Sequence, residues 1–140
     1  MAYCSEDDLL KMIPQLELAE LTAESGEVPD SLIIMDAMSK AASEIDSYLG
    51  VRYVVPLAAP PDRVKALAVD LAIYHLYSLR SVVPPVRQQK YDASLAFLKQ
   101  AAAGQLVIVG PQGELPTVAK EVADATSAIR AFTRDTQADW

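Results

Sequence analysis

The stretch ALAVDLAIYHLYSL, residues 66–79, decides the fold class because Asp70 is its only formally charged residue. Its apolar residues fall on two sides of a helix, with Leu67, Ala68, Leu71 and Ala72 on one and Val69, Ile73 and Leu76 on the other. A helix that is apolar nearly all round is typically buried in a protein core. The sequence therefore predicts a central helix over about 61–81, with other helices packed around it.

Proline and glycine residues divide the rest of the chain into further helices. Asp30 is a good N-cap, and apolar residues at spacings of three and four follow it as far as Leu49. Gly50 then occupies the place of a left-handed C-cap glycine. Two more helices are predicted at about 6–13 and 86–103, and a second short turn is predicted over 16–21.

The chain changes character after Gly104. Leu106 to Val109 is a short β-branched run between glycines, which predicts one strand. The closing stretch to Trp140 has no usable periodicity, although 119–129 could be helical on composition. The predicted fold is all-α: a compact bundle of four to five helices with a short strand and an extended C-terminal segment. Residues 1–104 are expected to form the helical domain, and 105–140 the strand and C-terminal arm of the same domain.

The composition fits one domain of 140 residues with a hydrophobic core, since 51% of the residues are hydrophobic. The formal net charge of -7 argues against nucleic acid or an anionic membrane as a partner, because both require a dense positive surface. No run approaches the ~20 apolar residues that span a bilayer. Cys4 is the one cysteine, so no internal disulfide is expected. Together these features predict a soluble, acidic, cytoplasmic domain.

Residues that could carry chemistry are few. The one histidine, His75, lies in the apolar helix, where a hydrogen-bonded core histidine is the favoured interpretation over a catalytic base. The nearest approach to a metal-binding loop is the group Glu24, Glu27 and Asp30 around Gly26, which lacks the alternating acids of such loops. The sequence predicts no cofactor and no metal ion.

Asp70 is the exception, because a carboxylate on an apolar helix must be paired, hydrogen-bonded or protonated. One interpretation is a perturbed catalytic acid. The favoured one is structural: Asp70 pairs with Arg52, or with the hydroxyl of Tyr53, Tyr74 or Tyr77, and anchors the loop after Gly50. On that interpretation Asp70→Asn would destabilise the protein by roughly 3–5 kcal/mol.

Five stretches distributed over nearly the whole chain carry a family resemblance: YCSEDDL (3–9), ASEIDSYLGVRY (42–53), DLAIYHLY (70–77), YDASLAFLK (91–99) and FTRDT (132–136). In this order and spacing they resemble the Mu-like prophage head–tail connector proteins. The resemblance implies a structural protein of the virion, assembled in the bacterial cytoplasm, without enzymatic activity. Related head-completion adaptors are small helical proteins that sit as a ring beneath the portal and bridge it to the tail. The implied partners are thus the portal, the tail-completion proteins and further copies of the chain, which can be monomeric when free.

The C-terminal segment is the predicted partner-binding element, through Phe132, Arg134, Asp135 and Trp140. Aromatic and arginine side chains are common interface anchors, but composition alone favours a loosely held terminus. The resemblance of 132–136 to connector proteins instead implies that this segment docks against a neighbouring subunit or the portal. Two other functions stay open on sequence alone. One is a helical adaptor or regulatory module of a bacterial cytoplasm; the other is a small enzyme that uses Asp70 with a tyrosine.

Overall fold

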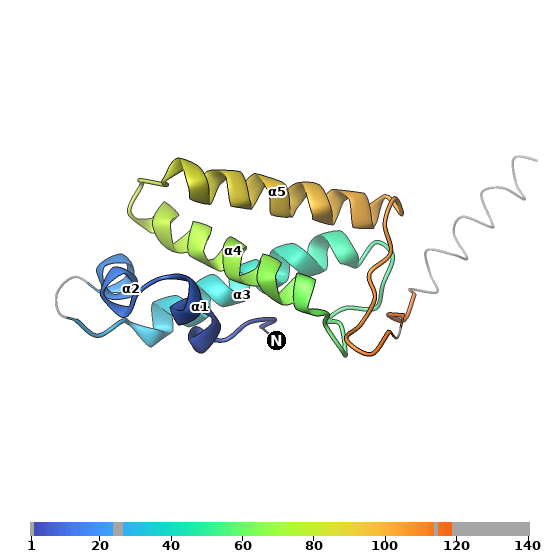
Figure 1. Ribbon diagram of the computed structural model, residues 1–140, viewed down its shortest axis with the longest axis horizontal. Coiled ribbons are helices and arrows are strands. Elements are labelled where there is room, and N and C mark those ends of the chain that lie inside the picture. The colour runs from blue at the N-terminus through green and yellow to red at the C-terminus, as the bar shows by residue number, and fades with distance from the viewer. Residues whose placement is uncertain (1, 24–26, 114, 119–140) are drawn as a thin grey trace, which may run out of the picture.

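The protein is a bundle of five α-helices, seen in a computed structural model that describes residues 2–23, 27–113 and 115–118 (Figure 1). The helices are α1 (Glu6–Met12), α2 (Gln15–Thr22), α3 (Ser31–Leu49), α4 (Asp62–Leu79) and α5 (Pro85–Ala102). Within the described ranges the strand-like pairing is one antiparallel bridge between Tyr53 and Val118. The predicted all-α bundle is confirmed.

Helix α4 forms the centre of the bundle, as its sequence predicted. It contacts each of the other four helices, and Figure 1 shows it crossing the middle of the molecule. Its buried residues come from both apolar sides of the helix: Val64, Leu67, Ala68, Val69, Leu71, Ala72, Ile73 and Leu76. Asp70 lies between these apolar sides, at the edge of the core, and its side chain is half-buried.

Side-chain caps fix the starts of α1 and α3. Ser5 and Asp8 form a reciprocal capping box at the start of α1. The Asp30 carboxylate accepts hydrogen bonds from the backbone N–H groups of Leu32 and Ile33 at the start of α3. These contacts satisfy backbone donors that no earlier turn of the helix can reach.

Gly50 does not adopt the predicted left-handed conformation. Its φ of -61° lies in the right-handed region, so that prediction is wrong. The residue instead provides room, because a Cβ atom at Gly50 would lie 2.8 Å from the carbonyl oxygen of Asp46.

A glycine in the left-handed region instead follows α5, where Gly104 has a φ of +79°. The N–H of Gln105 donates to the carbonyl of Gln100 at 2.9 Å, and the N–H of Gly104 donates to the carbonyl of Ala101 at 3.2 Å. This pair of bonds is a Schellman motif, which ends a helix by satisfying its last carbonyl groups.

The predicted strand over Leu106–Val109 is not formed. The segment is irregular, and no strand pairs with it among the described residues. Leu106 and Ile108 pack against the core while Val107 is 64% exposed, so the alternation that favoured a strand reflects packing against helices. The division between 1–104 and 105–140 stays a prediction, because most of the second part lies outside the described residues, as does the expected helix over 119–129.

Candidate functional site

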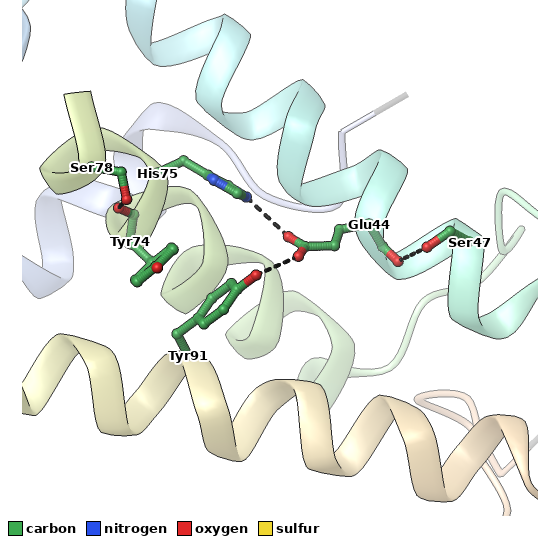
Figure 2. Close-up of polar contacts among 6 residues, drawn as sticks. All are labelled: Glu44, Ser47, Tyr74, His75, Ser78 and Tyr91. Carbon is green, nitrogen blue, oxygen red and sulfur yellow. Dashed lines mark hydrogen bonds and ion pairs between the residues drawn. The ribbon is translucent and has the colours of Figure 1, made fainter.

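A polar cluster of side chains lies at the junction of three helices (Figure 2). Glu44 projects from α3. Its Oε1 accepts a hydrogen bond from the Tyr91 hydroxyl of α5 at 2.7 Å, and its Oε2 lies 3.0 Å from Nε2 of His75 on α4. One carboxylate thus joins α3, α4 and α5; we call these three residues the Glu44 cluster.

Aromatic contacts hold the Glu44 cluster in place. The rings of Tyr74 and Tyr91 stack with centroids 3.8 Å apart, and the ring of His75 meets that of Tyr91 edge-on at 6.2 Å. Burial, together with the hydrogen bond to Glu44, raises the pKa of Tyr91 above its ordinary value, so the phenol stays a neutral donor. Both oxygens of Glu44 are occupied by partners within the chain, which makes the cluster an interhelical tie.

His75 is therefore a half-buried, hydrogen-bonded histidine, as its place in the apolar helix predicted. Glu44, the partner of His75, was not among the residues predicted to be important. A signal was present, since Glu44, His75 and Tyr91 each lie in one of the three interior stretches that resemble connector proteins.

Replacing Tyr91 with phenylalanine is expected to destabilise the protein by about 1.5 kcal/mol, because the Glu44 carboxylate loses a hydrogen-bond donor. The matched control is Tyr74→Phe, because the Tyr74 hydroxyl makes no hydrogen bond to any described residue. Urea unfolding of both variants measures the difference. Equal stability of the two variants would contradict a stabilising bond to Glu44.

Asp70 and Arg52 do not form the predicted pair. Burial raises the pKa of Asp70, and the positive charges of Lys90, Arg87 and Arg63 offset this in part. The Arg52 guanidinium lies against Gly104, where an added Cβ would be 1.8 Å from Nη1. Within the described ranges no hydrogen bond or ion pair joins Asp70 to Arg52 or to a tyrosine. The sequence could not show that α5 brings its basic residues to Asp70.

The expected effect of Asp70→Asn changes accordingly. A raised pKa means that the folded state binds the proton more tightly than the unfolded chain, whose aspartates titrate near ~3.9. The ionised carboxylate then weakens folding at pH 7, and the asparagine variant should melt at the same or a higher temperature there. The difference in melting temperature between the asparagine variant and the wild type should vanish as the pH falls to ~3.5, below the pKa of an unfolded-chain aspartate. Melting curves at the two pH values measure it. A clearly lower melting temperature at pH 7 would restore the paired interpretation.

Other polar side chains tie the N-terminal part to the long helices. The Tyr3 hydroxyl donates to the Asp46 carboxylate and accepts from the N–H of Leu57 at 2.9 Å. Tyr77 of α4 donates to Glu17 of α2.

Arg80 closes the end of α4 against α2. Its Nε donates to the carbonyl of Leu21 at 3.2 Å, and its Nη2 donates to the carbonyl of Ala23 at 2.9 Å. These bonds satisfy carbonyl groups at the end of α2 that its own helical turns leave open.

A surface hollow of about 680 Å³ lies beside these contacts, between α2 and the turn from α4 to α5. We call it the α2 groove. It is lined by Pro14, Leu16, Glu17, Glu20, Leu21, Tyr77, Arg80, Val82 and Pro84. Leu16 and Val82 are 58% and 69% exposed, so the groove presents apolar side chains to the solvent. Asp70 does not line it.

Within the described ranges no group of three or more histidine, cysteine, aspartate or glutamate residues could hold a metal ion. None of the described helices is both long enough and apolar enough to cross a membrane. The predicted partner-binding residues Phe132, Arg134, Asp135 and Trp140 lie outside the described residues, as do Glu24 and Gly26.

Comparison with known proteins identifies relatives over most of the chain. The family model described as Bacteriophage Mu, Gp36 matches residues 3–127, a range that includes all five helices and the Glu44 cluster. The chain is also 28% identical over 105 residues to the Mu-like prophage FluMu protein gp36 of Haemophilus influenzae, covering 74% of this chain and 73% of that protein. The chain therefore belongs to the bacteriophage Mu Gp36 family of phage proteins.

Proposed function

We propose that this protein is a structural component of the virion that acts as a head–tail connector, joining the portal to the tail during assembly. The observation that carries the proposal is the family match over residues 3–127, which makes it a phage protein along almost its whole length. The five stretches that resemble connector proteins support the connector role within that broader class.

The internal polar contacts support a structural rather than an enzymatic role. Glu44 is hydrogen-bonded to His75 and Tyr91, and Arg80 donates to a backbone carbonyl of α2. These side chains therefore connect helices to one another. The net charge of -7 is also suited to a ring around a channel that carries DNA, because an acidic wall does not bind the phosphate backbone. The partners in this proposal are the portal, the tail-completion proteins and further copies of the chain.

Deleting the gene from the phage that encodes the chain tests the connector role. Filled heads and complete tails should accumulate separately, and the wild-type gene supplied in trans should restore joined virions. Electron microscopy of gold-labelled particles should place the chain at the single vertex that carries the portal. Joined, infectious virions without the chain, or a label found only outside particles, would contradict the proposal; the second result would favour a cytoplasmic adaptor.

A further inference from the structure

We propose that the α2 groove of each subunit receives residues 129–134 of a neighbouring copy of the same chain. This inference rests on the proposed function, because it specifies how the subunits of a connector ring would hold one another. It assigns a partner to a hollow that combines exposed apolar side chains with charged groups of both signs.

The groove has the character of a peptide-binding surface. Its lining includes two exposed apolar residues, Leu16 and Val82, and the buried Leu21. Glu20 lines the groove and makes no hydrogen bond or ion pair with any described residue. Arg80 is held in place by the carbonyls at the end of α2, so its charge has a fixed position. A fitting ligand would bring apolar side chains, a positive charge near Glu20 and a negative charge near Arg80.

The C-terminal arm contains a segment with this chemistry. Residues 129–134 read IRAFTR, with two large apolar side chains and two arginines, and Asp135 follows directly. Phe132 could enter the apolar part of the groove while an arginine meets Glu20 and Asp135 meets Arg80. Buried aromatic and arginine side chains are the commonest anchors of protein interfaces.

The positions of groove and arm favour a neighbouring copy as the source. Figure 1 shows α2 and the α4–α5 turn at one end of the long axis and residues 105–118 at the other. The arm begins after Val118, which pairs with Tyr53 at that second end. Contacts between one end of a subunit and the opposite end of the next are head-to-tail, and such contacts generate a ring when the rotation between successive subunits closes.

The length of the arm allows this contact. The two ends are separated by at least the length of α5, whose 18 residues span about 27 Å. The 14 residues from 119 to 132 can extend to about 46 Å. In a head-to-tail contact the groove of the next subunit faces the end at which the arm begins, so an arm of this length is long enough for Phe132 to enter it.

Disulfide cross-linking in assembled particles tests the contact. The full-length double variant Val82→Cys/Thr133→Cys, which keeps the anchors Phe132 and Arg134, replaces the wild-type chain in the phage, and isolated particles are oxidised and separated without reductant. The native Cys4 can stay, because burial raises its pKa to about 11 and keeps the thiol protonated. We expect a ladder of dimers, trimers and larger covalent oligomers of this chain.

Matched controls isolate the groove. Each single-cysteine variant should give no ladder, and neither should Val107→Cys/Thr133→Cys, because Val107 is an exposed valine outside the groove. A ladder of equal strength from the Val107 control would overturn the inference. So would a cross-linked monomer, which places the arm in its own groove, or a cross-link from Thr133→Cys to another virion protein.

The outcomes also separate this inference from the proposed function. Particles that contain the chain but show no ladder would overturn the groove contact and leave the connector role intact. Particles that lack the wild-type chain altogether would overturn both.

Discussion

Replacing Leu71 with alanine is expected to lower the free energy of unfolding by about 2–5 kcal/mol. Leu71 is fully buried in α4, the helix that contacts all the others. Truncation would remove apolar surface from the core and leave a cavity that surrounding helices fill only in part. Because a domain is typically stable by only about 5–15 kcal/mol, this one change would remove a large share of its stability.

Leu79→Ala is the matched control, since Leu79 ends the same helix and is 54% exposed. Its effect should stay within about 0.5 kcal/mol, as for most surface substitutions. Chemical denaturation followed by circular dichroism measures both variants. Similar losses for Leu71→Ala and Leu79→Ala would mean that α4 is not the centre of the core.

Truncation after Ile129 is expected to abolish production of infectious particles while leaving the folded domain nearly as stable as the full chain. The described core extends no further than Ile108, so loss of residues 130–140 should cost little stability. The same truncation removes Phe132 and Arg134, the predicted anchors of the contact between subunits. Melting temperature of the purified chain and plaque formation by the phage measure the two effects.

The conservative control for the truncation is a full-length chain with Gln137→Ala, which keeps the proposed anchors. It should support normal plaque formation. If the truncated chain unfolds, the terminal segment belongs to the core of the domain. If the truncated chain supports normal assembly, the segment is dispensable and partner binding by Phe132 and its neighbours is wrong.

The Glu44 cluster marks the limit of sequence-based prediction at the candidate site. His75 was predicted to be a hydrogen-bonded histidine, because an imidazole on a buried helix needs a partner. The partners themselves lie 31 residues before it in one helix and 16 residues after it in another. Which residue meets His75 depends on how α3 and α5 are rotated about their own axes.

The neighbours of Asp70 could not be predicted from the sequence either. Burial does raise the pKa of Asp70, as expected for a carboxylate on an apolar helix, and nearby positive charges offset this in part. The predicted partner Arg52 was wrong because Arg52 lies against Gly104, and the basic residues near Asp70 come from α4 and α5.

The amino-acid sequence by itself determined the helices, their starts and the choice of α4 as the buried one. These features depend on residues within about four positions of each other: caps such as Ser5 and Asp30, proline and glycine between helices, and apolar spacing along one segment. Only the tertiary structure decided the partners of Glu44 and Asp70, the absence of a strand at Leu106–Val109, and the α2 groove. Each of these depends on the distance and rotation between segments far apart in the chain, which packing of the whole core sets.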